Sequence, residues 1–443
     1  MSKPHDDFIQ LLTNARKLQE THGAFVEIAE SVDARTVIAD QVLASVPFAV
    51  KDNIHTAGFG CGAGHPALSG SRPFVEASVV RRLRDAGAVP IGTTNMHELA
   101  FGITSNNGHF GAVRNPFDPS RVAGGSSGGS AVAVAAGVVP FALGTDTGGS
   151  MRVPASFCGV VGLRPSIGRY PADGVIPLSR TRDTIGVFGR SVTDVQTVDS
   201  VITGEYSALT TPLDIRKLRV GVPNSFFEDL APDVAQTSEL WLTILRDAGA
   251  ILVELDTSDL HAMDAECSFT IVLYEIVRDL AAYLEEHDQS LGGLRIEDLV
   301  KSSGSPDVAN LLTQALAGSI SKKDYIEALR TRDRMRARYA DIFSSQVDVL
   351  TYPTVRVLPP EIGEDSTIHH NGREVPVFPT IVANTGPGSI AGVPSISLPG
   401  LNSVHGLPIG MSIEAAAGTD RYLLNVARAI ERVTDFLSKF GRK

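Results

Sequence analysis

The chain of 443 residues has few cysteines, few aromatic residues and no long apolar run. Its three cysteines, Cys61, Cys158 and Cys267, cannot all pair within one chain, so a disulfide framework is not expected and a reducing compartment fits. The apolar runs stay well short of the roughly 18 residues that a membrane-spanning helix needs, and the N-terminal MSKPHDDFIQ has no apolar signal-peptide core. We therefore expect a cytoplasmic protein that has no membrane partner.

Clustered positive charge is lacking as well. The formal net charge is −11 at pH 7, and Lys and Arg form no basic cluster. Because surfaces that bind DNA or RNA are basic, nucleic acid is not expected as a partner. No spacing of cysteine and histidine indicates a metal site, no G-x-x-x-x-G-K-[ST] pattern indicates a P-loop, and we expect no cofactor.

The chain does contain a recurring alternation of helical and strand patterns. Residues 77–87 predict an amphipathic helix that ends at Gly87, and the apolar AVPIGTT after it predicts a strand. The same order recurs in SGGSAVAVAAG and VVPFALG, in residues 218–255, and in the strands DVLTYP, SISLPG and LPIGMSIEA before the helical DRYLLNVARAIERV. Apolar residues make up 43% of the chain, enough for a large core. Strands that alternate with helices predict an α/β fold, in which helices cover a sheet on both faces.

The composition changes after about residue 205, where the chain becomes more charged and more helical. No linker rich in Pro, Gly and Ser separates the two parts, so we expect one domain over residues 1–443. Its core is expected at about 40–205 and 345–440, with a helix-rich variable layer at about 225–345. A separate lobe that shapes a pocket is the alternative. The Pro-rich stretch 351–364 predicts a surface loop that borders the site.

Ser127 is the serine that fits the most familiar motif, because GSSGG at 125–129 reads G-x-S-x-G. That motif requires a strand that leads into the turn, and the preceding NPFDPSRVAGG has the composition of a turn. Ser127 is therefore not expected to be a nucleophile. His97 and His109 could act as bases, but a lone histidine is more often structural.

Lys51 ends the apolar run SVPFAVK, which predicts a buried strand. Burial disfavours the charged form of an amine, and a neutral lysine can act as a general base in a hydrolase that has no catalytic histidine. The alternative is a salt bridge between Lys51 and Asp52 or another carboxylate.

Ser150 comes directly after two glycines in GTDTGGSMR, which follows the predicted strand VVPFALG. Successive backbone amides from Thr147 to Ser150 can point into one cavity, because Gly148 and Gly149 have no Cβ in the way. Such a group of donors is what a developing oxyanion requires. A glycine-rich loop that binds nothing is the alternative.

Together these segments resemble the amidase signature family of serine hydrolases, which use a Ser-Ser-Lys triad. The resemblance covers nearly the whole chain. It is densest in SVPFAVKDNIHTAG, GTTNMHELAFG, RNPFDPSRVAGGSSGGSAVAVA, LGTDTGGSMRVPASFCGVVGLRPSIGRYP and LSRTRDTIG, and it returns in AGVPSISLPG and GLPIGMSI. It implies the amidase signature fold, a large mixed central β-sheet that helices cover on both faces.

By motif, Lys51 corresponds to the lysine of the family, Ser126 to its bridging serine and Ser150 to its nucleophile. The resemblance implies that neutral Lys51 takes a proton from Ser126, which takes one from Ser150, whose Oγ attacks the amide carbon. The relay returns a proton to the departing ammonia or amine, and water then hydrolyses the acyl-enzyme. In the family the peptide bond of the bridging serine is typically cis.

The resemblance also implies roles for the neighbouring residues. The backbone amides expected to stabilise the oxyanion are those of Thr147, Gly148, Gly149 and Ser150. The residues expected to support the site without reacting are Ser127, Asp146 and Arg152.

The segments VIPLSRTRDTIGVFGRSVTDV and ANTGPGSIAGVPSISLPG look closest to the indole-3-acetamide and mandelamide hydrolase branch, which implies a small primary amide of an aryl-acetic type acid. The alternatives are the glutamine-hydrolysing A subunit of a tRNA-dependent amidotransferase and a hydrolase of urea-type amides such as biuret or allophanate. Alignment at AGVP places Val382 where the amidotransferase subunit has its glutamine-binding aspartate, which disfavours that subunit. A non-enzymatic binding subunit would be expected to lack one of the three triad residues, and all are present. Dimers are common in relatives, which leaves a homodimer open.

Overall fold

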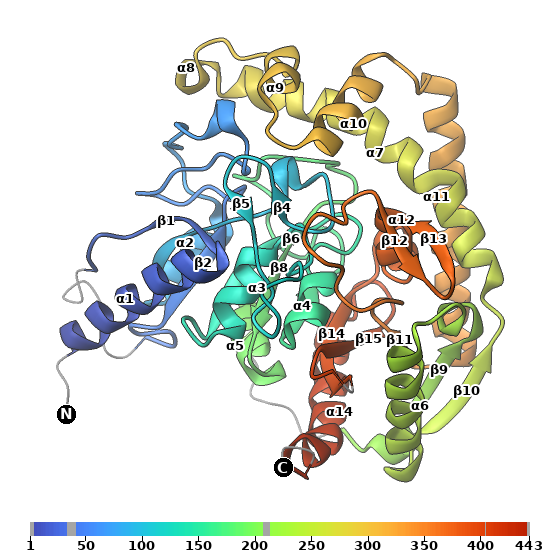
Figure 1. Ribbon diagram of the computed structural model, residues 1–443. Coiled ribbons are helices and arrows are strands. Elements are labelled where there is room, and N and C mark those ends of the chain that lie inside the picture. Colours follow the sequence, from blue (N-terminus) through green and yellow to red (C-terminus); the bar gives the residue numbers. More distant parts are fainter. Residues whose placement is uncertain (1–3, 33–40, 207–212, 404, 441–443) are drawn as a thin grey trace.

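The computed structural model describes residues 4–32, 41–206, 213–403 and 405–440. At its centre is an 11-stranded mixed β-sheet with the order β1-β3-β2-β6-β8-β7-β14-β15-β11-β9-β10 (Figure 1). Its strands are β1 (Phe25–Ile28), β2 (Pro47–Lys51), β3 (Val89–Thr94), β6 (Phe141–Asp146), β7 (Val161–Arg164), β8 (Thr184–Gly189), β9 (Arg219–Pro223), β10 (Ile251–Leu255), β11 (Val349–Pro353), β14 (Ser395–Asn402) and β15 (Pro408–Glu414). Two small separate hairpins pair β4 (Asn106–Asn107) with β5 (Gly111–Ala112), and β12 (Thr367–His370) with β13 (Arg373–Pro376).

The α-helices of the described residues lie before, between and after these strands. They are α1 (Pro4–His22), α2 (Ser78–Asp85), α3 (Gly128–Ala135), α4 (Arg152–Cys158), α5 (Val192–Thr203), α6 (Pro232–Asp247), α7 (Ser258–Glu286), α8 (Asp288–Leu291), α9 (Ile296–Ser302), α10 (Pro306–Leu316), α11 (Lys322–Asp341), α12 (Val377–Val382), α13 (Gly386–Ala391) and α14 (Asp420–Phe440). In this part of the chain, every helix is too short or too polar to span a lipid bilayer.

The central strands contribute side chains to two apolar cores. In β6, Phe141 and Leu143 belong to a core that also contains residues of α2, α5, α6 and α14. Ala142, between them, belongs to a second core with residues of α1, α3 and α4. Successive side chains of a strand point to opposite faces, so the two groups of helices cover opposite faces of the sheet. This confirms the predicted α/β fold.

The parallel part of the sheet positions the candidate site. Strand β2 pairs in parallel with both β3 and β6, so the C-terminal ends of the three strands meet at one edge of the sheet. Lys51, Thr94 and Asp146 are the last residues of these strands. The turn that follows β6 leads directly into α4, which brings Ser150 to the same edge.

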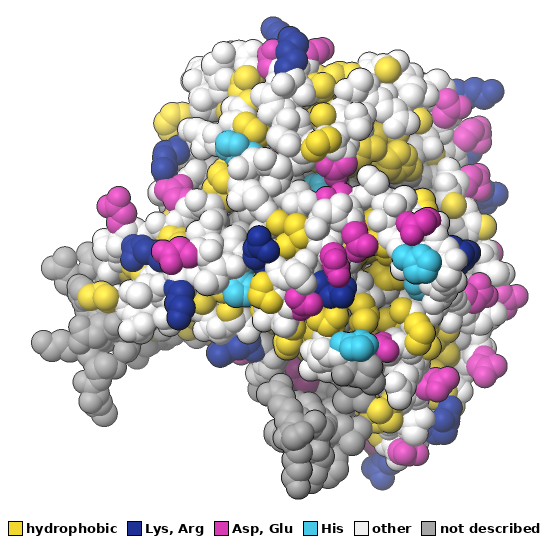
Figure 2. Space-filling view, viewed as in Figure 1, with side chains coloured by type: hydrophobic (Ala, Val, Ile, Leu, Met, Phe, Trp, Pro, Cys, Tyr) yellow, Lys and Arg dark blue, Asp and Glu magenta, His cyan; other side chains and the backbone are white. Residues whose placement is uncertain are grey.

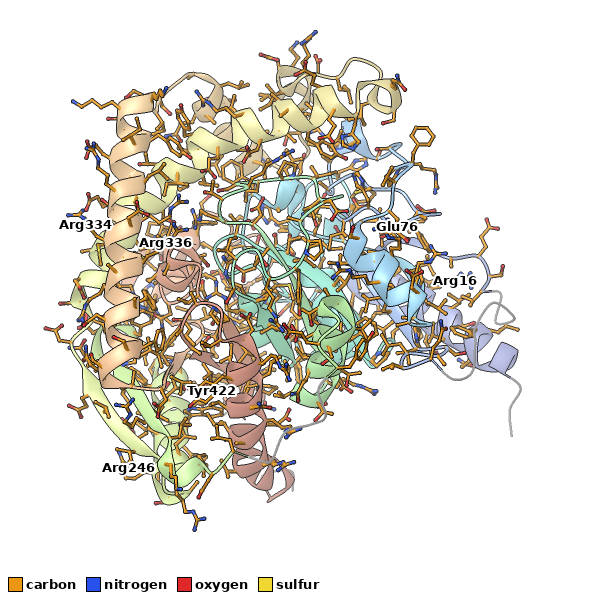
Figure 3. The ribbon with its side chains drawn as sticks, turned by 180° about the vertical axis from the view of Figure 1, so that it is seen from behind. Arg16, Glu76, Arg246, Arg334, Arg336 and Tyr422 are labelled. Atoms are coloured by element: carbon orange, nitrogen blue, oxygen red, sulfur yellow. The ribbon has the colours of Figure 1, made fainter. Side chains whose placement is uncertain are left out.

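A layer of long helices lies beside this edge. Helix α7 packs against α10, α11 and α13, and it runs across the top of the sheet in Figure 1. Arg334 of α11 pairs with Glu266 of α7 at 3.2 Å, on the outer side of the layer that Figure 3 shows from behind. The inner side of α7 is therefore the side available to the site.

Surface charges are mixed in sign. On the face shown in Figure 2, Lys and Arg side chains lie singly among Asp and Glu and do not gather in one patch. Ion pairs join several of the charged residues of the protein, such as Arg84 with Glu76 at 3.0 Å and Arg338 with Asp259 at 2.9 Å. Exposed pairs of this kind contribute little to stability, so the apolar cores are what hold the sheet and its helices together.

The stretch 351–364 does not form the simple surface loop that its prolines predict. Its first three residues complete strand β11, where Tyr352 is fully buried. Val355 and Val357 then pack in a small apolar cluster with residues of α4 and α12. The predicted exposure of this stretch is wrong because tertiary neighbours cover its apolar side chains, whereas its predicted place at the border of a cavity is kept by Arg356.

Candidate active site

Lys51 lies at the centre of a buried polar cluster at the end of β2. Its side chain is fully buried, and its Nζ donates to Ser126 Oγ at 2.8 Å and to Thr145 Oγ1 at 2.7 Å. Among the described residues, no carboxylate lies within ion-pairing distance of this amine. The Asp52 carboxylate instead accepts a hydrogen bond from the backbone of Gly64 at 2.8 Å, which contradicts the predicted alternative of a Lys51–Asp52 salt bridge.

Burial sets the protonation of this amine. It lowers the pKa of Lys51 from 10.5 to about 7, and the more distant charges of Asp146 and Asp183 oppose this shift only in part. A substantial fraction of the Lys51 side chains is therefore neutral at neutral pH. A neutral Nζ has a lone pair and can accept a proton from the hydroxyl that it contacts.

Ser126 and Ser127 are both fully buried in the loop before α3, and they point to different partners. The peptide bond between Gly125 and Ser126 is cis, as the family resemblance implies. The Ser127 Oγ donates to the carbonyl oxygen of Thr145 at 3.0 Å and accepts from its backbone N–H at 3.3 Å. Ser127 therefore ties the loop to β6, whereas Ser126 contacts the lysine.

Asp146 organises the turn that carries Ser150. Its buried carboxylate accepts hydrogen bonds from the backbone of Gly149 at 2.8 Å and of Met151 at 3.0 Å, and it pairs with Arg152 at 3.2 Å and Arg164 at 3.0 Å. Burial alone would raise the pKa of Asp146, but the two guanidinium groups hold it well below its usual range. The carboxylate therefore stays ionised, and its hydrogen bonds to the backbone of Gly149 and Met151 hold the turn in place on both sides of Ser150.

The turn itself differs in one respect from its prediction. The amide of Gly149 was expected to point into a cavity with its neighbours, but it donates to Asp146. Gly149 has a φ of +146°, and a Cβ at this position would lie 2.3 Å from Thr385 Oγ1. This close approach explains why the position requires glycine. The amides of Thr147, Gly148 and Ser150 have no hydrogen-bond partner among the described residues, and they are the donors that a ligand can use.

Ser150 is nearly buried and lines a narrow cavity together with Thr147 and Gly148. This cavity opens into a larger one of about 580 Å³. The two are continuous because they share the lining residues Phe101, Gly102, Ile103, Ser268, Phe269, Phe378 and Val382. Most of these side chains are apolar, so the space above Ser150 suits an apolar or aromatic group.

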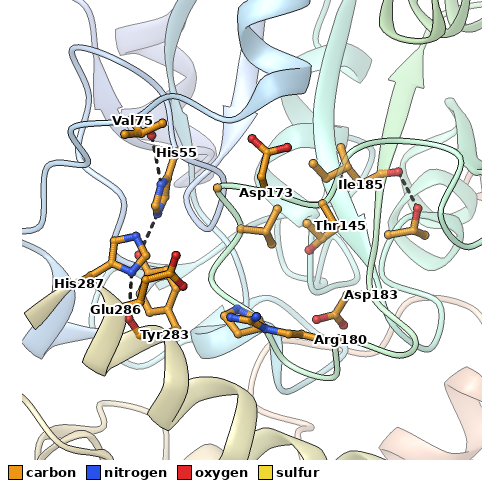
Figure 4. Close-up of a pocket in the computed structure, with 15 residues that line it drawn as sticks. His55, Val75, Thr145, Asp173, Arg180, Asp183, Ile185, Tyr283, Glu286 and His287 are labelled. Carbon is orange, nitrogen blue, oxygen red and sulfur yellow. Dashed lines mark hydrogen bonds between the residues drawn. The ribbon is translucent and has the colours of Figure 1, made fainter.

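A second cavity, of about 550 Å³, reaches the cluster from another side (Figure 4). It is lined by Thr145 and Asp183, and by a group of polar side chains that includes His55, Arg180, Tyr283 and His287. His55 Nε2 and Tyr283 Oη are 2.8 Å apart, and burial lowers the pKa of His55 to about 4, so this histidine is neutral. Asp183 accepts a hydrogen bond from Thr147 Oγ1 at 2.5 Å and so braces the turn from this side.

The two histidines considered as bases have other surroundings. The His97 ring pairs with Asp307 at 3.0 Å in the wall of the larger cavity, while its backbone N–H donates to the Ser126 carbonyl oxygen at 3.1 Å. His109 packs its ring against Phe110. In the described part of the chain, no three His, Cys, Asp or Glu side chains gather in a way that could hold a metal ion.

Sequence reasoning missed Thr145 and Asp183 as part of this cluster. Thr145 is adjacent to Asp146 in the sequence. Its contact with Lys51 follows from the parallel register of β2 and β6, and this register cannot be read from the sequence. Asp183 lies in the LSRTRDTIG segment, and its position opposite Thr147 follows from the pairing of β6 with β8. Their closeness in sequence to the two glycine-rich turn segments and to LSRTRDTIG was the one available signal.

Comparison with known proteins gives a consistent result. The family model described as Amidase matches residues 13–424. An indoleacetamide hydrolase of Agrobacterium vitis is 42% identical over 400 residues, covering 89% of this chain and 85% of that protein. A mandelamide hydrolase of Pseudomonas putida is 38% identical over 409 residues, covering 88% of this chain and 78% of that protein. A solved structure titled "Crystal structure of amidase" superposes with a TM-score of 0.84 at 33% identity, covering 97% of this chain and 96% of that chain.

Proposed function

The chain belongs to the amidase family, and we propose that it hydrolyses a small primary amide of an aryl-acetic type acid to the acid and ammonia. Membership of the family and the named relatives make it an amidase, a hydrolase of carbon–nitrogen bonds in linear amides. The observation that carries the finer proposal is the buried contact between Lys51 Nζ and Ser126 Oγ, at the edge of the sheet to which the turn after β6 also brings Ser150.

In the proposed reaction, neutral Lys51 accepts the proton of Ser126, and Ser126 accepts the proton of Ser150. The Ser150 Oγ then forms a bond to the amide carbon of the substrate, and the carbonyl oxygen becomes an oxyanion. The lowered pKa of Lys51 supports this assignment, because an amine that is mostly protonated at neutral pH could not start the relay.

The proposed oxyanion donors are the backbone amides of Thr147, Gly148 and Ser150. They lie in the narrow cavity beside the nucleophile and have no partner among the described residues. Preorganised donors in a water-poor site stabilise the charge that develops in the transition state. When the tetrahedral intermediate collapses, the proton held by the relay passes to the leaving nitrogen, which departs as ammonia. A water molecule then cleaves the ester to Ser150 by the same relay in reverse.

The walls of the larger cavity support an aryl group as the acyl substituent. Three phenylalanines, Phe101, Phe269 and Phe378, line it together with Val382. Aromatic rings bury large areas and stack or pack edge to face with one another. Val382 itself carries no charge, so the position that the sequence comparison aligns with a glutamine-binding aspartate adds only apolar surface to this wall.

The test is a substrate screen joined to identification of the nucleophile. We expect purified protein to release ammonia from indole-3-acetamide, mandelamide or phenylacetamide in preference to glutamine, biuret and aliphatic amides. A serine-directed sulfonyl fluoride should modify the peptide that contains Ser150, as located by mass spectrometry. Ser150→Ala should lower kcat by about 10⁴-fold or more, because the loss of a covalent nucleophile leaves only binding and oxyanion stabilisation.

Two controls make the assignment specific. Ser319→Ala changes an exposed serine at the end of the helical layer and should keep the wild-type rate. Ser127→Ala removes the serine that fits G-x-S-x-G and should still yield a Ser150 adduct. An adduct on Ser127, or full activity of Ser150→Ala, would show that the proposed nucleophile is wrong.

A further inference from the structure

Asp264 is one of three aspartates that line the larger cavity. The other two have partners, because Asp307 pairs with His97 and Asp365 accepts hydrogen bonds from Thr104 and Asn106. Asp264 lies on α7, one turn before Ser268, and both residues line the larger cavity above Ser150. Its Oδ1 atom is shielded from solvent and has no hydrogen-bond partner among the described residues. An unpartnered carboxylate oxygen in such a place is costly, and the cost is relieved when a bound ligand supplies a donor.

The absence of a side chain at Gly386 allows the carboxylate to reach this position. A Cβ at Gly386 would lie 2.5 Å from Asp264 Oδ2. Gly386 also lines the narrow cavity with Ser150, so Asp264 stands where the narrow cavity opens into the larger one. A substrate whose amide carbon is at Ser150 would extend its acyl group past this carboxylate.

The charge of Asp264 is set by its neighbours. Burial raises the pKa of Asp264 to about 6, and the nearby Arg182 guanidinium and a hydrogen bond from the Ser268 side chain oppose this rise. The carboxylate is therefore mostly ionised at neutral pH and acts only as a hydrogen-bond acceptor. Arg182 itself lines the narrow cavity and donates to the carbonyl oxygen of Ser268 at 2.8 Å, and it forms no ion pair with Asp264 within the described residues.

Arg182 also restricts which hydrogen-bond donors of a substrate can bind beside Asp264. A substrate ammonium group beside Asp264 would be repelled by this second cation, whereas a neutral N–H group would not. The neighbouring walls are aromatic, with Phe269 and Phe378 on the same cavity. A flat ring that carries its own N–H fits both features.

We propose that Asp264 is a specificity-determining residue that accepts a hydrogen bond from a ring N–H of the acyl group, as in an indole. This inference rests on the proposed arylacetamide hydrolase function. It adds that the Asp264 carboxylate selects acyl groups whose ring carries an N–H. A site built to accept a hydrogen bond discriminates strongly against an analogue that lacks the donor, because the acceptor is then buried without a partner. Asp264 has no part in the proton relay.

The experiment compares two substrates of the same shape. Indole-3-acetamide has the ring N–H, and benzothiophene-3-acetamide replaces it with sulfur. For the wild-type protein we expect kcat/KM to be at least about tenfold higher for the indole, the size expected of a hydrogen bond to a charged group. In Asp264→Leu, which keeps the bulk and removes the acceptor, we expect the ratio to fall to about one, mainly through loss of rate with the indole. Asp264→Asn, which keeps one acceptor oxygen without the charge, should give an intermediate ratio.

Glu266→Gln is the matched control. Glu266 lies two residues along the same helix, pairs with Arg334 on the outer side and is exposed, so this variant should keep the wild-type ratio. A wild-type ratio near one, or an unchanged ratio in Asp264→Leu and Asp264→Asn, would overturn the inference. Equal losses on both substrates would assign Asp264 a structural role and would overturn it as well. Failure of the wild-type protein to hydrolyse either arylacetamide would instead contradict the proposed function, and this inference would fall with it.

Discussion

Acidification from about pH 9 to about pH 5.5 should protonate the Lys51 amine and remove the proposed general base. Because burial lowers the pKa of this amine to about 7, we expect kcat/KM to be nearly constant above that pH. Below it, kcat/KM should fall about tenfold for each pH unit, since the neutral fraction of the amine falls by that factor. An amine with the ordinary pKa of 10.5 would instead keep losing activity from alkaline pH downwards.

The same shift predicts a dependence of stability on pH. In the unfolded chain the amine regains its ordinary pKa of 10.5, so between about pH 7 and 10.5 the unfolded state holds a proton that the folded state lacks. Folding stability therefore rises with pH in this window, by up to about 1.4 kcal/mol per unit, and the full shift corresponds to about 5 kcal/mol. Below about pH 7 both states hold the proton, and this cost of burying the amine is present in full.

Lys51→Met isolates these effects. Loss of the amine leaves Ser126 and Thr145 without a shared partner, but that cost does not depend on pH. We expect the stability of the wild-type protein relative to the variant to increase from about pH 7.5 to about pH 9.5, as measured by urea unfolding. Asp52 and Asp183, whose pKa values burial raises to about 7 and about 6, titrate near the same range, so the difference between the two proteins is the informative quantity.

Lys301→Met is the control, because the Lys301 side chain is 77% exposed and lies far along the chain in the helical layer. It should change neither the pH profile of the rate nor that of stability. The base role of Lys51 would be refuted by a rate that is flat from pH 9 to 5.5, or by full activity of Lys51→Met at neutral pH. A stability difference that does not change with pH would refute the lowered pKa itself.

Three further substitutions test other parts of the site. Arg152→Met removes one of the two guanidinium groups that pair with buried Asp146, and we expect the free energy of unfolding to fall by about 3–5 kcal/mol in urea titrations. Gly149→Ala places a Cβ 2.3 Å from Thr385 Oγ1 at a φ of +146°, so the turn must move. We expect kcat for ammonia release to fall more than about tenfold, and an unaffected kcat would argue against the turn as the oxyanion site. Val382→Asp places a carboxylate beside the phenylalanines of the larger cavity. Steady-state kinetics should show KM for arylacetamides raised by about tenfold, whereas an unchanged KM would place the aryl group elsewhere.

Much of the fold could be predicted because its signals are local. The alternation of apolar residues indicated strands at β3, β6, β14 and β15 and helices at α2 and α14, and the structure has them. The error at 351–364 has the opposite cause. Whether Val355 and Val357 are exposed or buried depends on α4 and α12, which pack over them from distant parts of the sequence.

The candidate site divides in the same way. Lys51, Ser126 and Ser150 could be singled out because each lies in a short segment with a recognisable composition. The polar residues that surround them could not, since their contacts depend on which strands are neighbours. The Gly149 amide shows the limit within a single turn: its direction depends on Asp146, which two arginines hold in place.

The sequence by itself determined the class of fold, the presence of two glycine-rich turns that carry Gly-Gly-Ser and the position of a lysine at the end of an apolar strand. These depend on residues within a few positions of one another, whose conformations and burial follow from local pattern. Only the tertiary structure decided that the amine of Lys51 meets Ser126 and Thr145, with no carboxylate of the described residues paired to it, and that Asp264 lines the cavity beside Gly386. The physical reason is that burial and hydrogen bonding join groups far apart in the chain, and the pairing of strands and packing of helices bring those groups together.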